Sequence, residues 1–124
     1  MIRKLQLTEI GSGNLKNALK SGSAWSVQAI GFGDSDEWQD GSETDLLGSN
    51  TTYFDADRFE PDEYTITYNI TLWGGQLPTP IKEIGLFKNR TETNNYLFLR
   101  AICDPIYITN QSSWIYFAIS LTFK

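Results

Sequence analysis

Two stretches of the chain alternate strictly between apolar and polar residues, the pattern of a β-strand with one buried face. Aromatic and β-branched residues occupy every second position from Tyr64 to Trp73, and Trp114 to Phe123 repeats this period. Less regular strand candidates lie at 26–33, 81–88 and 96–103, and residues 106–109 are either a short strand or the approach to the next one. Glycine, proline and polar turns separate these segments, with Asp104-Pro105 as one such break. The pattern predicts a mainly β fold, an antiparallel β-sandwich or barrel.

One segment has a helical period instead. Leu15, Ala18 and Leu19 fall on one face of a helix over 14–20, which Ser12 or Asn14 can cap and Gly22 can end. We therefore expect one short N-terminal helix. Residues 1–11, which come before it, are either an extended arm or an edge strand.

Length and composition indicate a single domain over residues 1–124. The chain has 124 residues, of which 40% are hydrophobic, and this is enough for a core without metal or disulfide support. There is no apolar run of membrane-spanning length and no signal-peptide pattern at the N-terminus, so no membrane role is expected. The one cysteine, Cys103, fits folding in a reducing cytoplasm.

Charge is concentrated in one part of the chain. Residues 34–63 carry eleven acids and one base, whereas residues 1–33 carry four bases and one acid. Residues 34–50 are also rich in glycine and serine, which predicts a long acidic loop with one helical turn at 44–47. The segment is either a surface that docks on a basic neighbour, including a second copy of the chain, or a solvated loop. Neither reading favours direct binding to nucleic acid.

The residue types argue against catalysis. There is no histidine, which removes the common triads and the commonest metal ligand, and one cysteine cannot form a thiolate zinc site. The glycines at 31–33 lack the Lys-Ser/Thr of a phosphate-binding loop. Residues 36–41 resemble a calcium loop, but Trp38 and Leu47 stand where ligands are needed, so only an irregular site stays open. We expect no enzyme activity, cofactor or bound metal.

The remaining candidates are residues for structure or interaction. Glu83 lies between apolar positions, and a carboxylate buried there needs a partner. Arg58 and Arg100 are the two candidate partners, and a solvent-facing Glu83 on an edge strand is the alternative. Trp38 is either a core residue or an interface anchor. The full set of candidates is Gly31, Gly33, Asp34, Trp38, Arg58, Glu83, Gly85 and Arg100.

Several motifs occur in a characteristic order. Ala29-Ile30-Gly31-Phe32-Gly33-Asp34 follows the helical segment, and an acidic stretch then ends near Leu46-Leu47. Gly74-Gly75, Ile81-Lys82-Glu83-Ile84-Gly85-Leu86-Phe87 and Leu99-Arg100 come later. Over residues 14–123 this order resembles the N-terminal, virion-attaching domain of tail-collar fibre proteins of tailed bacteriophages, and small phage structural proteins that share it. Phe32 departs from the small or polar residue usual there, and no fibre shaft follows Lys124, which favours a stand-alone component.

The resemblance implies a virion structural protein, made in the host cytoplasm, that works by assembly in the tail or fibre-attachment apparatus. Its partners would be other virion proteins and copies of itself, in a homo-oligomer within the particle. Two alternatives stay open. One is a protein that decorates or cements the capsid, and the other is a carbohydrate-binding β-sandwich that uses tryptophan and tyrosine side chains.

Overall fold

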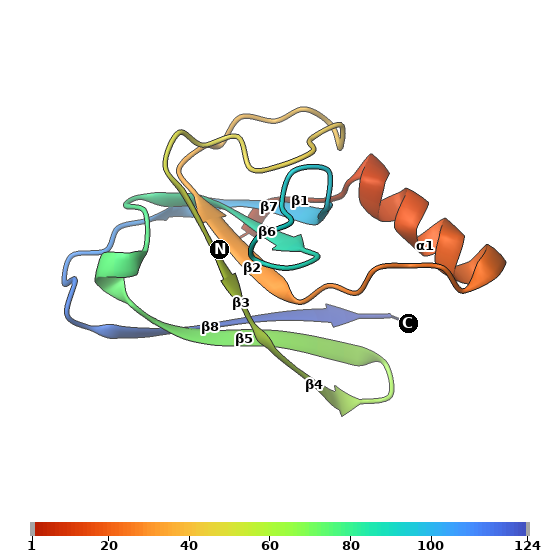
Figure 1. Cartoon of the computed structure of the whole chain (residues 1–124). Helices are drawn as coiled ribbons and strands as arrows, with labels where there is room; N and C mark the ends of the chain where they lie inside the picture. The colour runs from red at the N-terminus through yellow and green to blue at the C-terminus, as the bar shows by residue number, and fades with distance from the viewer. Residues whose placement is uncertain (1, 124) are drawn as a thin grey trace.

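The computed structural model describes residues 2–123, and it consists of two antiparallel sheets packed face to face (Figure 1). The five-stranded sheet has the order β1 (Ile2–Leu7), β7 (Leu97–Ile106), β6 (Ile81–Phe87), β2 (Ala29–Gly33) and β3 (Thr51–Asp55). The three-stranded sheet has the order β4 (Asp57–Asp62), β5 (Thr65–Trp73) and β8 (Trp114–Thr122). One helix, α1 (Glu9–Ser21), and a 3-10 turn, η1 (Gly74–Gln76), complete the described elements. The predicted mainly β sandwich with an N-terminal helix is confirmed.

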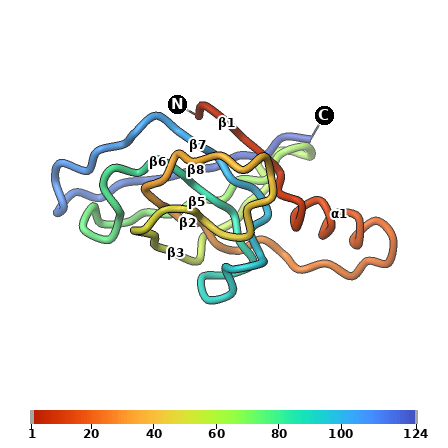
Figure 2. Tube along the Cα trace, turned by 90° about the horizontal axis from the view of Figure 1, so that it is seen from above, coloured from red at the N-terminus to blue at the C-terminus, as the bar shows by residue number. Residues whose placement is uncertain are grey.

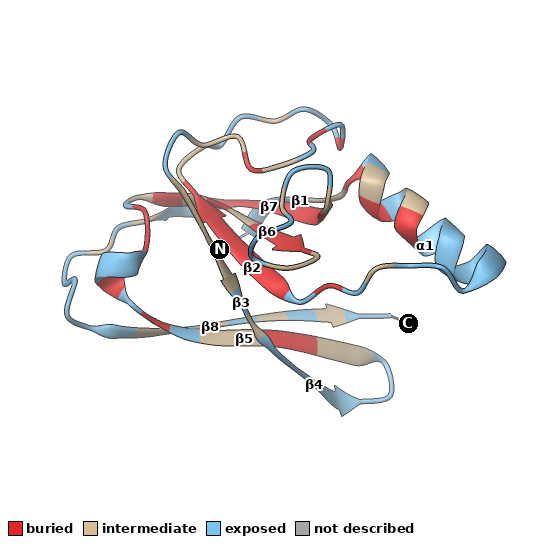
Figure 3. Cartoon of the chain, viewed as in Figure 1, coloured by how far each residue is buried: buried red, intermediate tan, exposed pale blue. Residues whose placement is uncertain are grey.

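The core lies between the two sheets. Ile30, Phe32 and Leu86 are fully buried on the inner face of the five-stranded sheet. The rings of Phe32 and Phe117 are 4.7 Å apart between centroids, which joins β2 to β8. Along β8 half-buried and exposed residues alternate without exception, as the sequence pattern predicts. Figure 3 shows the buried residues concentrated in the five-stranded sheet, while much of the three-stranded sheet remains accessible.

The sandwich is closed on one side and open on the other. Strands β3 and β4 are separated by Ala56 alone, so the chain passes directly from one sheet to the other there. On the opposite side, β1 and β8 are edge strands of different sheets. Because one sheet has five strands and the other three, the inner face of β1 is only partly covered, and Leu5 is 54% exposed.

Helix α1 starts earlier than the predicted segment 14–20. The side-chain oxygen of Thr8 accepts a hydrogen bond from the backbone N–H of Gly11 at 3.0 Å, so Thr8 is the N-cap rather than Ser12 or Asn14. Asn14 instead bonds both backbone polar groups of Trp25. The predicted end is confirmed, because Gly22 adopts a left-handed conformation with φ of 71°.

Three other expectations differ from the structure. Residues 44–47 contain no helical turn, because the Leu47 N–H donates to Glu83 and the Thr44 carbonyl accepts from the Asn95 N–H instead. Strands β3 and β4 were not predicted. Strand β3 is only five residues long, and in the exposed strand β4 the acids and Pro61 hide the β pattern. Asp104-Pro105 lies inside β7 rather than breaking it. Pro105 stands beyond Cys103, the last residue of β7 that pairs with β1, so its missing N–H is tolerated there.

Residues 2–7, left open as an arm or an edge strand, form the edge strand β1.

Within residues 2–123, no helix combines the length and the apolar character needed to cross a membrane.

Two glycines of α1 make a matched test of how the helix packs on β7. A Cβ added to Gly11 would fall inside contact distance of the Phe98 carbonyl oxygen, whereas a Cβ on Gly13 meets nothing within 4 Å. We expect Gly13→Ala to raise the free energy of unfolding by about 0.5–1 kcal/mol, because alanine favours the helix. Gly11→Ala gains the same propensity, but it must displace the helix from β7 and should destabilise the protein. Urea denaturation of both variants measures the difference, and equal effects would contradict this packing.

Candidate functional site

The acidic loop, residues 34–50, lies on the outer face of the five-stranded sheet. It is a loop, as predicted, but without the helical turn expected at 44–47. Figures 1 and 2 show it, in orange to yellow, crossing the strands on the side away from the three-stranded sheet. Most of the candidate residues from the sequence lie in this loop or directly beneath it. This part of the molecule is therefore the candidate functional site.

A buried ion pair forms the centre of the site. Glu83 of β6 and Arg100 of β7 both have fully buried side chains, and the Arg100 Nε lies 3.0 Å from Glu83 Oε1. Both side chains project from the outer face of the sheet, beneath the acidic loop. Of the two partners proposed for Glu83, Arg100 is therefore correct. Arg58 is wrong, because it lies exposed on β4 in the other sheet, opposite Tyr68.

The ion pair binds the backbone of the acidic loop at both ends. Glu83 accepts hydrogen bonds from the backbone N–H groups of Ser35, Leu47 and Gly48, at 3.1, 2.9 and 2.7 Å. Arg100 donates to the carbonyl oxygens of Glu37 and Ser35, at 2.6 and 3.3 Å. Two buried charges thus satisfy five backbone groups of a segment that has no secondary structure of its own. A loop on the surface needs partners of this kind if it is to hold one conformation.

The candidate glycines make room for this arrangement. Gly31 of β2 and Gly85 of β6 face each other across the ladder, and Leu46 from the loop packs above them. A Cβ on Gly31 would lie 2.7 Å from a ring atom of Phe87, and one on Gly33 would collide with the carboxylate of Glu83. Around the glycine pair, a second apolar cluster comprises Ala29, Leu46, Phe87, Leu97 and Tyr53. The glycines therefore allow the loop to pack closely on the sheet.

The remaining candidates hold the loop at its margins. Asp34 Oδ1 accepts from the Asn50 N–H at 3.1 Å, which joins the two ends of the loop. The Lys4 ammonium lies 5.0 Å from the ring centroid of Trp38, a cation–π contact between β1 and the loop. The Trp38 Nε1 also donates to Asp40 at 2.7 Å. Trp38 is thus a contact within the chain, half-buried against β1.

Sequence reasoning missed the pair formed by Tyr53 and Asp45. The Tyr53 hydroxyl donates to Asp45 Oδ1 at 2.7 Å, and Thr93 donates to the other oxygen at 3.2 Å. Burial raises the pKa of Tyr53 to about 12, and the Asp45 carboxylate adds to the shift. Tyr53 therefore remains protonated, and a donor, at neutral pH. Only the isolated Leu46-Leu47 pair in an acidic stretch could have signalled that this loop folds back on the sheet.

Two other groups of chemical interest, the Glu43 carboxyl and the Cys103 thiol, are buried. Glu43 is buried, with Oε1 accepting from the Gln39 N–H at 2.7 Å and Oε2 unpaired, but among residues 2–123 no three acidic, cysteine or histidine side chains are grouped as a metal site would need. The Cys103 thiol is buried, and burial raises its pKa, which disfavours the nucleophilic thiolate. The arrangement presents an ordered acidic surface.

Comparison with protein-family models, with curated proteins and with solved structures finds no match to this chain.

The ion pair can be tested by comparing the loss of its cation alone with the loss of both charges. We expect Arg100→Met to lower the free energy of unfolding by about 3–5 kcal/mol, because it leaves Glu83 buried without its cation. Glu83→Gln/Arg100→Met should lose less than Arg100→Met alone, since the neutral amide leaves no buried charge unpaired and its single oxygen can still accept from the Ser35 and Gly48 N–H groups. Urea denaturation gives the free energies, and hydrogen exchange at Ser35, Leu47 and Gly48 reports on the loop.

The matched control is Arg90→Met, which removes an exposed arginine 3.7 Å from Asp55. That change should stay within about 1 kcal/mol. Equal losses in the two arginine variants, or unchanged exchange in the loop of Arg100→Met, would contradict the central role of the pair.

Proposed function

We propose that this protein is a structural component of a tailed-bacteriophage virion, and that it works by assembly in the tail or fibre-attachment apparatus. The supporting observation is that the motifs carrying the resemblance come together in one place. Gly31 and Gly33 from the first motif, and Glu83 and Gly85 from the second, lie beneath the acidic loop. Arg100 completes that group. Motifs separated by some fifty residues therefore serve one purpose, the support of a surface loop.

The rest of the surface agrees with a role in assembly. Large apolar side chains are exposed on α1, on β1 and at the end of β8, and Leu19 is 91% exposed. A subunit that acts alone gains nothing from this exposure, whereas an assembling subunit buries such residues against its neighbours. The proposal gives the chain other virion proteins and copies of itself as partners, and no catalytic step.

The direct test is to find the protein in particles. Particles of the phage that encodes the chain would be purified, the copies per particle measured by quantitative mass spectrometry, and the subunit located by electron microscopy. We expect a fixed copy number and density at the tail or collar that fits this sandwich. A non-structural protein of the same phage serves as the control for carry-over. Absence from purified particles would contradict the proposal, and density on the capsid surface would replace the tail location with capsid decoration.

One observation favours a second candidate, carbohydrate binding. Trp73 and Trp114 face each other across the β5–β8 ladder with ring centroids 3.8 Å apart and planes 32° apart. Tyr116 follows two positions later on the same face of β8, and all three side chains are exposed. The other outward residues of the two strands are threonine, serine, asparagine and alanine, without a charge. Exposed aromatic rings on an uncharged polar face suit the apolar faces of sugar rings.

Tryptophan fluorescence separates this candidate from the first. If the face binds sugar, neutral oligosaccharides should change the emission, and Trp114→Ala should weaken the binding by at least about tenfold. Trp25→Phe, a change on the other side of the molecule, is the control for the fluorescence lost when any tryptophan is removed. An emission spectrum that no oligosaccharide changes would remove this candidate.

A further inference from the structure

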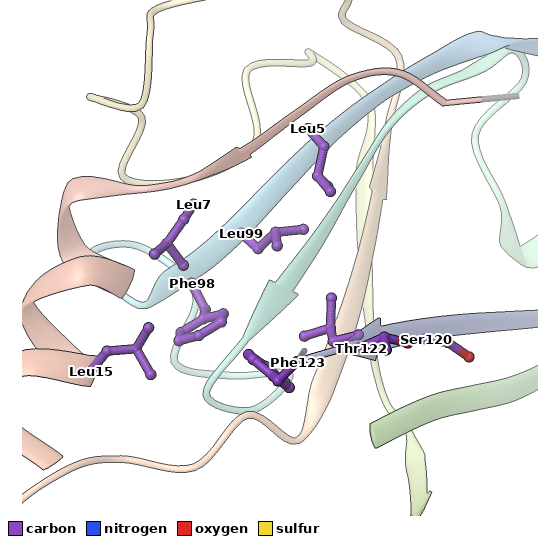
Figure 4. A pocket seen from close by; sticks show the side chains of 9 residues that line it. Leu5, Leu7, Leu15, Phe98, Leu99, Ser120, Thr122 and Phe123 are labelled. Atoms are coloured by element: carbon purple, nitrogen blue, oxygen red, sulfur yellow. The ribbon is translucent and has the colours of Figure 1, made fainter. Parts of the chain in front are cut away.

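A groove runs along the open side of the sandwich. Its lining includes Leu5 and Leu7 of β1, Leu15 of α1, Phe98 and Leu99 of β7, and Phe123 after β8 (Figure 4). It has a volume of about 290 Å³. Figure 4 shows these side chains converging from β1, α1, β7 and the residue that follows β8. The groove exists because the three-stranded sheet supplies no strand opposite β1.

The border of the groove is basic. Leu15 and Leu19 lie four residues apart on one face of α1, and Lys16 and Lys20 have the same spacing on the adjoining face. Leu15, Leu19 and both lysines are exposed. On β1, Arg3 lies 3.9 Å from Asp104 and Lys4 contacts Trp38, so Lys16 and Lys20 are the bases that remain at this border. An occupant of this site should therefore combine apolar side chains with negative charge.

The same chain carries a segment of that description. The acidic hairpin, residues 57–64, comprises β4 and the turn into β5, and it has four acids against one base. Every residue of it is exposed, including Phe59 and Tyr64, which are 48% and 50% exposed. Pro61 and an irregular register at 59–62 make β4 a poor edge for adding a strand. The hairpin therefore suits contact through side chains and charge.

No residue of the hairpin lines the groove of its own molecule, although the Tyr64 carbonyl accepts a hydrogen bond from the N–H of Phe123, at the end of the groove, at 2.7 Å. Strands β4 and β8 are the two edges of the three-stranded sheet, with β5 between them. The hairpin is also continuous with the closed side of the sandwich through Ala56, whereas the groove is on the open side. Among residues 2–123, Glu60 and Glu63 form no ion pair with Lys16 or Lys20, so these opposite charges remain available for a contact between molecules.

We propose that the acidic hairpin of one copy binds the basic apolar groove of another copy. Phe59 and Tyr64 would enter the groove, and Glu60 and Glu63 would face Lys16 and Lys20. This contact rests on the proposed function, because it is one way in which the chain would assemble. It also gives a role to the exposed leucines of α1, which the acidic loop does not explain.

A charge-swap experiment tests the contact in the full chain. The first variant is Glu60→Lys/Glu63→Lys, and the second is Lys16→Glu/Lys20→Glu. These side chains make none of the side-chain hydrogen bonds that the structure shows, and circular dichroism and thermal melting check folding. Sedimentation velocity measures self-association of the wild type, of each variant and of their equimolar mixture, at about 50 mM and about 500 mM salt.

We expect the wild type to self-associate at low salt. Its association constant should fall at least about tenfold at high salt. The association constant of each variant alone should be at least about tenfold lower, because the hairpin and the groove then carry charge of the same sign. The mixture should recover association, since each variant complements the other. Asp36→Lys/Glu37→Lys changes the net charge as the first variant does, but in the acidic loop, and should behave as the wild type.

Two results would overturn the inference. One is a mixture that fails to recover association, and the other is a wild type that stays monomeric at both salt concentrations. A monomer that is nevertheless found in virions would assign the groove to a different subunit, and the proposed function would stand without this contact. A chain that associates as described but is absent from virions would keep the contact and remove the proposed function.

Discussion

The conformation of the acidic loop depends on the buried pair of Glu83 and Arg100. Moving two such charges out of water costs several kcal/mol for each ion, and their mutual attraction alone does not ensure that this cost is recovered. Here the carboxylate accepts four hydrogen bonds, and the guanidinium donates three. Because most of these bonds go to the loop backbone, the pair fixes the loop as much as it fixes the two strands. The loop, in turn, shields the pair from solvent.

The buried pair also determines which residues can surround it. A fully buried carboxylate needs space, which Gly33 and Gly48 provide because neither has a Cβ. The glycine pair at 31 and 85 provides similar space for Leu46. The outer face of the five-stranded sheet therefore works as a second, smaller core beneath a loop whose other side is acidic. This explains why a sheet face that would otherwise meet water carries buried residues along β2 and β6.

The sequence predicted the fold class well because its two best strands, β5 and β8, pack one face inward and leave the other exposed, so the period of two is visible. It predicted β2 and β6 less precisely, since both faces of these strands are covered and the alternation disappears. Strand β4 was missed because its acids and Pro61 are typical of loops, and β3 because it has only five residues and lies next to that segment. The Glu83–Arg100 pair was within reach of sequence reasoning, since a carboxylate among apolar residues needs a cation. The choice between Arg58 and Arg100 was not, because it depends on which sheet each strand joins.

The hydrogen bonds that hold the acidic loop have one further consequence. Glu83 and Arg100 contact only its main-chain N–H and C=O groups, at Ser35, Glu37, Leu47 and Gly48. Main-chain groups are the same whatever the side chain, apart from the need for glycine where Gly48 meets the carboxylate. The outward side chains at positions such as Asp36 and Glu37 can therefore be exchanged while the anchoring bonds persist. The fold thus separates the residues that hold the loop from the residues that give its surface a specificity, so new specificities can evolve without rebuilding the support.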